Sequence, residues 1–273
     1  MPMTDRPRQT DAVILAAGKG TRMNSDLPKV LHPVAGRPMV QWVLDAARQA
    51  GANRRVVVVG YRADDVRDAL RDADDVDFVD QTEQLGTGHA VMVARPRFAA
   101  ALADPAPEGA GEDEVFVLAG DMPLLRGRTL ARLLQAHRDA GAAGSLATAR
   151  LAEPTGYGRI VRDADGAFLR IVEQKDADPE QLAIDEVNVS CYCFQVAPLF
   201  EALDKVDRSN AQGEFYLTDV LGIFREAGLT VIAAPIVPED EAEGINNPEQ
   251  LHRVDAALRA RVDDPDPKGE PVS

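Results

Sequence analysis

A short stretch near the N-terminus, residues 15–29, combines small residues with two cations that could bind phosphate. It begins Leu-Ala-Ala-Gly-Lys-Gly-Thr-Arg and ends in Leu-Pro-Lys. Small residues let backbone N–H groups approach a triphosphate closely. Arg22 can bind phosphate oxygens through two N–H groups, and Lys29 can neutralise charge at an α-phosphate. The residues whose backbone is expected to bind the nucleotide are Leu15, Ala16, Ala17 and Gly18.

Two better-known phosphate-binding loops do not match this stretch. It lacks the Gly-Lys-Ser/Thr ending of a Walker A loop. It also lacks the third glycine that a dinucleotide-binding fingerprint would place after Gly18 and Gly20. The whole stretch with its terminal Pro-Lys therefore predicts a triphosphate-binding loop that serves nucleotidyl transfer.

A candidate metal ligand follows the apolar strand expected at residues 115–119. Asp121 lies where open α/β sheets bind ligands, at the carboxyl end of a strand, and a carboxylate suits Mg²⁺. Gly120, next to it, is a further nucleotide-binding candidate. The amide oxygen of Asn246, in the run Gly-Ile-Asn-Asn-Pro, could complete the metal site, although such a turn is also an ordinary helix cap.

A third segment, residues 81–90, could recognise a base. The Gln81 side chain has both an amide donor and a carbonyl acceptor, which suits the imide edge of uracil. Gly86 and Thr87 would place backbone groups against the base. His89 lies one turn into the helix expected at residues 88–100 and is interpreted as a structural histidine.

These segments together resemble a known family. The first stretch resembles the signature of sugar-nucleotide pyrophosphorylases. Its continuation, which contains His32 and Pro33, is similar to the N-terminal domain of the bacterial bifunctional N-acetylglucosamine-1-phosphate uridylyltransferase/glucosamine-1-phosphate acetyltransferases. The similarity covers roughly residues 11–261. It implies that Asp121 binds Mg²⁺, that Gln81, Gly86 and Thr87 bind uracil, and that the substrates are UTP and a sugar 1-phosphate.

The resemblance also implies which residues hold the sugar ring, namely Gly156, Glu173 and Asn188. Relatives usually carry a small residue and then glycine after the asparagine, whereas this chain has Val189 and Ser190. A Cβ at Ser190 could crowd the sugar. The resemblance implies N-acetylglucosamine 1-phosphate as the acceptor, and because of this departure another sugar 1-phosphate, such as glucose 1-phosphate, is the alternative. Residues 210–219 also match the family and are interpreted as the start of a helix, 213–226, that packs the sugar-binding half.

Strands and helices alternate along the first half of the chain, which predicts a doubly wound, Rossmann-like α/β sheet. Later strands are joined by short turns. With the resemblance, this predicts a nucleotidyltransferase of the glycosyltransferase-A-like type, with a mixed central sheet and a small antiparallel sugar-binding portion. The expected domain is 11–261, with a nucleotide-binding half at about 11–143 and a sugar-binding half at about 144–247. Residues 1–10 and 262–273 are expected to be disordered.

Composition excludes several partners. The formal net charge of -15 and the pI of about 4.7 predict a surface that repels nucleic acid and anionic membranes. No apolar run reaches the roughly 18 residues of a membrane span, and the polar N-terminus has no signal-peptide core. A cytoplasmic protein is therefore expected.

The expected reaction joins UTP and the sugar phosphate by in-line displacement at the α-phosphorus. The attacking phosphate oxygen is already anionic, so no general base is required. The chain ends at Ser273, before the β-helix of its bifunctional relatives, so no acetyltransferase activity is expected. The oligomeric state, UTP against dTTP, and truncation against natural single function stay open. A non-catalytic nucleotide-sugar sensor and a cytidylyltransferase of the same fold class are the rival interpretations.

Overall fold

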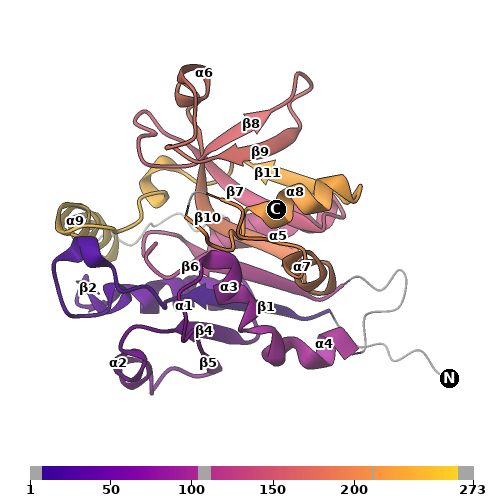
Figure 1. Ribbon diagram of the computed structural model, residues 1–273. Coiled ribbons are helices and arrows are strands. Elements are labelled where there is room, and N and C mark those ends of the chain that lie inside the picture. The colour runs from indigo at the N-terminus through magenta and orange to yellow at the C-terminus, as the bar shows by residue number, and fades with distance from the viewer. Residues whose placement is uncertain (1–7, 104–111, 211, 264–273) are drawn as a thin grey trace.

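The computed structural model describes residues 8–103, 112–210 and 212–263 (Figure 1). Most of the two segments expected to be disordered, at the N-terminus and in the C-terminal tail, lies outside these ranges. The centre is a nine-stranded sheet whose main path runs β11-β7-β10-β6-β1-β4-β5. The strands of this main path are β1 (Thr10–Leu15), β4 (Arg55–Val59), β5 (Val76–Asp80), β6 (Glu114–Ala119), β7 (Gly144–Arg150), β10 (Glu186–Gln195) and β11 (Val231–Ala234).

The order of the parallel strands predicts a ligand site between β1 and β6. β1 pairs in parallel with β4 on one side and with β6 on the other, and β5 extends the sheet beyond β4. The chain thus moves from β1 outwards through β4 and β5 and then returns to β6. Open α/β sheets bind ligands at such a reversal, at the carboxyl ends of the strands. Leu15 and Ala119 pair at this edge.

The later strands make the sheet mixed, as expected. β10 runs antiparallel to both β6 and β7, and β11 pairs in parallel with β7. A hairpin of β8 (Arg159–Arg162) and β9 (Phe168–Val172) adds the small antiparallel portion, and it extends beyond the main sheet beside β10 (Figure 1). A second, two-stranded sheet consists of β2 (Pro33–Val34) and β3 (Arg37–Pro38).

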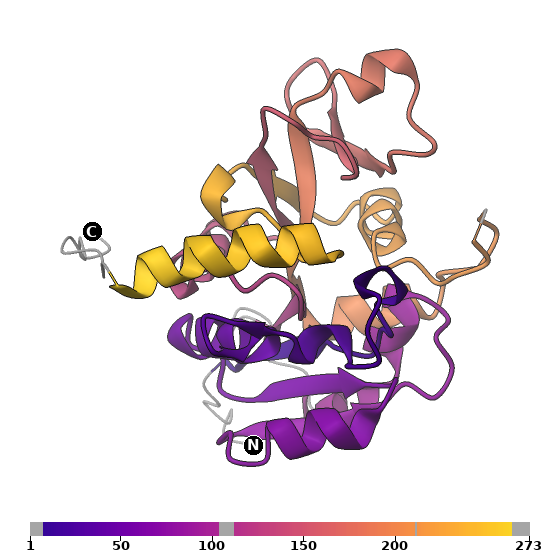
Figure 2. The ribbon, with the colours of Figure 1, turned by 90° about the vertical axis from the view of Figure 1, so that its left-hand side faces the viewer.

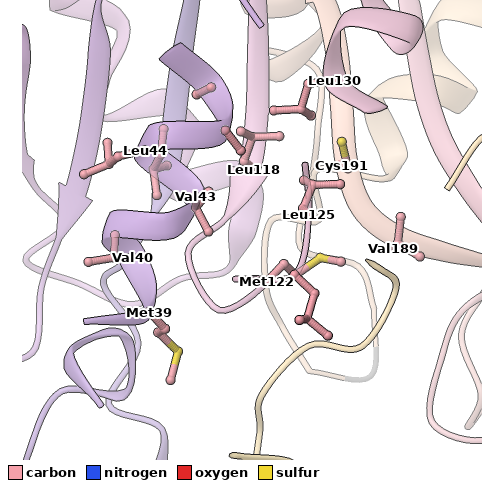
Figure 3. Close-up of a cluster of buried hydrophobic side chains, with 14 of the residues drawn as sticks. Met39, Val40, Val43, Leu44, Leu118, Met122, Leu125, Leu130, Val189 and Cys191 are labelled. Atoms are coloured by element: carbon pink, nitrogen blue, oxygen red, sulfur yellow. The ribbon is translucent and has the colours of Figure 1, made fainter. Parts of the chain in front are cut away.

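Helices cover both faces of the sheet and form two apolar cores. One core packs α1 (Met39–Gln49), α2 (Ala63–Ala69), α5 (Gly127–Asp139) and α9 (Pro248–Asp263) on the sheet. Figure 3 shows side chains of α1, β6 and β10 meeting there. The other core contains α3 (Thr87–Met92), α7 (Val196–Leu203) and α8 (Asp219–Glu226). Figure 2 shows α9 crossing one side of the molecule. Within the described ranges, no helix is both long and apolar enough to cross a membrane.

Two helix predictions need correction. The helix expected at 88–100 is divided into α3, a 3₁₀ turn (Arg95–Phe98) and α4 (Ala99–Ala103). Pro96 explains the break, because proline lacks the N–H of a helix interior and its ring clashes with the preceding turn. The helix expected from residue 213 begins only at Asp219. Residues 213–216 form no helix or strand and residues 217–218 form a turn, and the backbone of Phe215 bonds instead to Leu85 and Gly88.

Secondary structure extends beyond the expected domain bounds of 11 and 261 at both ends. β1 begins at Thr10, which is buried, and the Arg8 guanidinium lies 2.8 Å from the Glu114 carboxylate. α9 continues to Asp263. The polar composition of the N-terminus did not reveal the contact between Arg8 and Glu114, because the two residues are distant in sequence.

A buried histidine joins α5 to β7. His137 is 2% exposed, and its Nδ1 lies 2.7 Å from Oγ of Ser145. Its Nε2 has no hydrogen-bond partner within the described part of the chain. Burial lowers the pKa of His137 to about 4, against the opposing pull of the Glu114 carboxylate. The imidazole is therefore neutral in the folded protein at neutral pH.

Acidification should destabilise the fold through this residue. Between pH 6.5 and about 4, His137 binds a proton in the unfolded chain but stays unprotonated in the folded protein. The free energy of unfolding therefore falls as the pH falls. The loss should approach about 3 kcal/mol over this window. The variant His137→Asn retains a polar partner for Ser145 and cannot titrate. Urea unfolding from pH 7 to 4 should show a shallower decline for the variant, and identical slopes would contradict the assignment.

Candidate functional site

Three side chains from distant parts of the chain meet at the carboxyl ends of β1 and β6. The Lys29 ammonium donates to Oδ2 of Asp121 and, at 3.0 Å, to Oδ1 of Asn246. The Lys29 and Asp121 side chains are each only 17% exposed. All three were candidates from the sequence, and the structure brings them together.

Arg22 belongs to the same cluster. Its guanidinium donates to Oδ1 of Asn246 at 3.0 Å. It lies in a 3₁₀ turn (Thr21–Met23) within the loop that follows β1. Two cations therefore face one amide oxygen and one carboxylate, an arrangement suited to holding an anionic ligand once it reaches this edge.

Backbone hydrogen bonds hold the two segments that carry Asp121 and Asn246. The N–H of Ile245 donates to the carbonyl of Asp121 at 2.9 Å, which ties the 244–246 loop to the end of β6. The N–H of Asn246 donates to Oε1 of Gln250, on α9, at 2.8 Å. Asn247 caps α9 through its own side chain, which accepts from the N–H of Gln250 at 2.9 Å. Asn246 is thus left with its side chain directed to Lys29, while its neighbour serves as the cap.

The residues present fit a divalent cation. Oδ2 of Asp121 and Oδ1 of Asn246 both accept from one ammonium, so both oxygens face a common cationic position. Carboxylate and amide oxygens are ligands that Mg²⁺ accepts. The described residues include no group of three or more His, Cys, Asp or Glu placed to hold a metal. Any further ligands at this position would therefore come from water or from phosphate oxygens.

The loop after β1 offers backbone donors. Leu15 ends β1, and Ala16 and Ala17 are buried beyond it. In the described structure, the N–H groups of Gly18 and Lys19 bond to no protein acceptor. A Cβ added at Gly18 would meet no atom within 4 Å, so the space beside it is open. Gly120 closes the loop from β6, since its N–H donates to the carbonyl of Leu15 at 3.0 Å.

The base-binding candidates lie beside this loop. Gln81 follows β5 and is 5% exposed, and its Nε2 donates to the carbonyl of Gly86 at 3.1 Å. The hydroxyl of Thr87 accepts from the N–H of Leu217 at 3.1 Å. The 215–217 segment therefore packs against the candidate base-binding loop. The prediction from the sequence was that residues 210–219 pack against the sugar-binding half.

The sugar-binding candidates lie around the β8–β9 hairpin and β10. The amide of Asn188 donates to the hydroxyl of Tyr192 at 2.8 Å and accepts from the N–H of Ser190 at 3.0 Å. Burial, reinforced by the charge of Glu173, raises the pKa of Tyr192, so its hydroxyl stays protonated. The N–H of Gly156 donates to Oε1 of Gln174 at 2.8 Å.

Ser190 occupies an unusual backbone conformation. Its φ is +53°, in the left-handed region that favours glycine. The departure from the family pattern noted in the sequence therefore falls where a glycine would be relaxed. A bulge in the β10–β7 ladder between Asn188 and Tyr192 accommodates it. The serine side chain is held at this place at a cost in backbone strain.

Glu241 is a buried structural carboxylate that could not be recognised from the sequence. Glu241 is fully buried, and its Oε2 accepts from the N–H of Arg126 at 3.1 Å and from Oγ1 of Thr129 at 2.7 Å. It thereby caps the N-terminus of α5 from a distant loop, where the helix dipole favours a negative charge. The same loop continues to Asn246. An acidic run at residues 239–243 gave no sign that one of its members is buried.

One groove of the described structure does not coincide with these residues. It has a volume of about 630 Å³ and lies between α1, the start of α5 and the end of α9. Its lining includes Trp42, Leu124 and Val262 and none of the candidate site residues.

Sequence comparisons identify proteins that are similar to this chain. A family model described as MobA-like NTP transferase domain matches residues 12–185. Curated relatives named bifunctional protein GlmU are 48% identical in Pelobacter propionicus, 48% in Geobacter metallireducens and 49% in Heliobacterium modesticaldum, each over 92% of this chain. The chain spans about half the length of these relatives, 51–52%.

A solved structure has the same fold. The crystal structure of UDP-glucose pyrophosphorylase complexed with UDP-glucose is similar with a TM-score of 0.72, over 93% of this chain and 99% of that one. The two sequences are 18% identical, so the likeness concerns the fold alone. It confirms the mixed, Rossmann-like nucleotidyltransferase architecture expected from the sequence.

Replacing the buried cap should destabilise the protein. Glu241→Ala leaves the N–H of Arg126 and the hydroxyl of Thr129 without their acceptor, which should cost about 2–4 kcal/mol in the free energy of unfolding. Glu249, whose side chain is 83% exposed, provides the control, and Glu249→Ala should change stability by less than about 0.5 kcal/mol. Chemical denaturation measures both. Equal stability of the two variants would show that Glu241 is no anchor.

Proposed function

The chain belongs to the MobA-like NTP transferase domain family, and from that premise we propose that it transfers the uridylyl group of UTP to N-acetylglucosamine 1-phosphate and releases pyrophosphate. The observation that carries the proposal is the meeting of Lys29, Asp121 and Asn246 beside a loop with unbonded N–H groups. The relatives named bifunctional protein GlmU support the choice of nucleotide and sugar. The proposal places the reaction in the cytoplasm, on small-molecule substrates.

The chain's own residues act by binding and orienting the two anions. N–H groups at Gly18 and Lys19 and the guanidinium of Arg22 hold the triphosphate. The Lys29 ammonium neutralises charge that develops at the α-phosphorus during displacement. The sugar phosphate supplies an oxygen that is already ionised, so no side chain has to remove a proton. Most of the rate enhancement then comes from positioning and charge neutralisation.

The proposal also includes a metal-binding position. Asp121 and Asn246 would hold Mg²⁺, which, when bound, neutralises phosphate charge and orients the two substrates. Lys29 contacts the same two oxygens in the described structure, so the ammonium and a divalent cation compete for them. Gln81, Gly86, Thr87 and Gly120 are proposed to bind the nucleotide, and Gly156, Glu173 and Asn188 to bind the sugar.

The proposal is tested by mixing the protein with UTP, Mg²⁺ and N-acetylglucosamine 1-phosphate and measuring pyrophosphate. Glucose 1-phosphate, dTTP and CTP in separate reactions measure selectivity. The expected result is that UTP with N-acetylglucosamine 1-phosphate has the highest kcat/KM. A higher value for glucose 1-phosphate would refute the proposed sugar, and no release with any pair would refute catalysis.

Single substitutions in the cluster should remove activity without unfolding the chain. Lys29→Met and Asp121→Asn should each lower kcat by about 10²–10³-fold, because each removes charge that acts on the transferring phosphate. Lys205→Met, which changes an exposed lysine far from the cluster in sequence, is the matched control. Steady-state kinetics and thermal melting measure the effects. Near-normal kcat in either cluster variant would exclude this mechanism.

Removing the competing ammonium should tighten metal binding. In the absence of nucleotide, Lys29→Met leaves the Asp121 carboxylate unpaired, so Mn²⁺, used as a spectroscopic probe, should bind about tenfold more tightly than to the wild type. Electron paramagnetic resonance of free Mn²⁺ measures the affinity, and Lys205→Met should match the wild type. Unchanged or weaker binding by Lys29→Met would show that lysine and metal do not share these oxygens.

A further inference from the structure

The Gln81 side chain is held by two acceptors from the start of α3. Its Nε2 lies 3.1 Å from the carbonyl oxygen of Gly86 and 3.2 Å from Nδ1 of His89. The backbone N–H of Gln81 donates to the carbonyl of Val59 at 2.7 Å, which fixes the residue to the end of β4. Both ends of the glutamine are therefore anchored.

The chemistry of these partners sets the direction of the amide. A backbone carbonyl oxygen only accepts hydrogen bonds, so the Gln81 atom beside Gly86 must be the NH₂ group. Rotating the amide by 180° would place two oxygens in contact. The second hydrogen of the same NH₂ group then faces His89, whose Nδ1 must be the unprotonated nitrogen of a neutral ring.

This arrangement leaves one atom of the amide for a ligand. Among the described residues, no donor bonds to Oε1 of Gln81, and Oε1 is not one of the polar atoms sealed from solvent. Gln81 thus presents an acceptor and no donor. A uracil ring carries a donor, N3–H, between its two carbonyl groups, whereas cytosine carries an acceptor at N3.

We propose that His89 is a positioning residue for base selection, which holds the Gln81 amide so that only Oε1 faces the base. The inference rests on the proposed function, in which Gln81 meets the nucleotide base. An acceptor at this point binds the N3–H of uracil or thymine and repels N3 of cytosine. Selection against cytosine then depends on His89, although His89 need not touch the base.

Contacts with Phe215 fix the position of the helix that carries His89. Gly86, which precedes α3, has a φ of +106°, and a Cβ there would lie 2.6 Å from the carbonyl oxygen of Phe215. The N–H of Gly88 donates to this same oxygen at 2.8 Å, and the N–H of Phe215 donates to the carbonyl of Leu85 at 2.7 Å. The centroids of the His89 and Phe215 rings are 6.3 Å apart. Segment 215–217 therefore holds α3 in the place where His89 reaches Gln81.

A purely structural histidine would behave differently in two variants. In asparagine, Oδ1 is attached to Cγ, as Nδ1 is in histidine, so His89→Asn can keep an acceptor toward Gln81. His89→Leu has a similar volume and no acceptor. A packing role predicts that leucine is tolerated at least as well as asparagine, whereas the positioning role predicts that only asparagine restores selection.

The decisive measurement is the ratio of UTP to CTP affinity. Isothermal titration of each nucleotide into wild type, His89→Asn and His89→Leu gives binding ratios, and kcat/KM for each nucleotide gives the same ratios during turnover. The ratio for His89→Leu should fall about tenfold, mainly through weaker UTP binding, while His89→Asn stays within about threefold of the wild type. The KM for N-acetylglucosamine 1-phosphate should stay unchanged. His252→Leu, on the exposed side of α9, is the control.

Two results would overturn the role of His89. One is a UTP-to-CTP ratio in His89→Leu equal to that of the wild type, and the other is an equal fall in both variants. Absence of pyrophosphate release by the wild type would refute the proposed function instead. In that case the titrated binding ratios still decide whether His89 selects the base.

Discussion

The contact of one ammonium with two oxygens organises the candidate functional edge of this protein. Lys29 arrives from the loop after β1, Asp121 from the end of β6, and Asn246 from the loop before α9. Each would face a desolvation cost if it were buried alone, so the three stabilise one another. β1 and β6 are neighbours in the sheet, at the point where the order of the strands reverses, and this brings Lys29 and Asp121 together. Asn246 completes the cluster.

Much of the surrounding structure serves to hold these loops. The Glu241 carboxylate fixes the 239–246 loop to the start of α5, and the backbone of Ile245 joins the same loop to Asp121. On the nucleotide side, the 215–217 segment holds the loop that precedes α3. Two contacts distant in sequence therefore support the two sides of one site, so substitutions remote from the substrates can change its geometry.

The sequence predicted the parts of the site that follow local rules. A loop of small residues after a buried strand and an aspartate at a strand end can be recognised from order and type alone, which is why Lys29 and Asp121 were candidates. Glu241 and Tyr192 could not be, because their roles depend on partners in other elements. The region before Asp219 was wrongly predicted as helix, since its backbone bonds to residues 85–88 instead. Ser190 was noticed as a departure, but only the structure shows its positive φ.

The central claim is that a phosphate oxygen of the sugar phosphate attacks the α-phosphorus of UTP at this edge. It is tested most directly with N-acetylglucosamine 1-phosphate whose non-bridging oxygens carry ¹⁸O, incubated with unlabelled UTP, Mg²⁺ and the protein. Phosphorus NMR of the products should show ¹⁸O bridging the two phosphorus atoms of the sugar nucleotide and unlabelled pyrophosphate. Labelled pyrophosphate, or no sugar nucleotide with a bridging label, would contradict the claim.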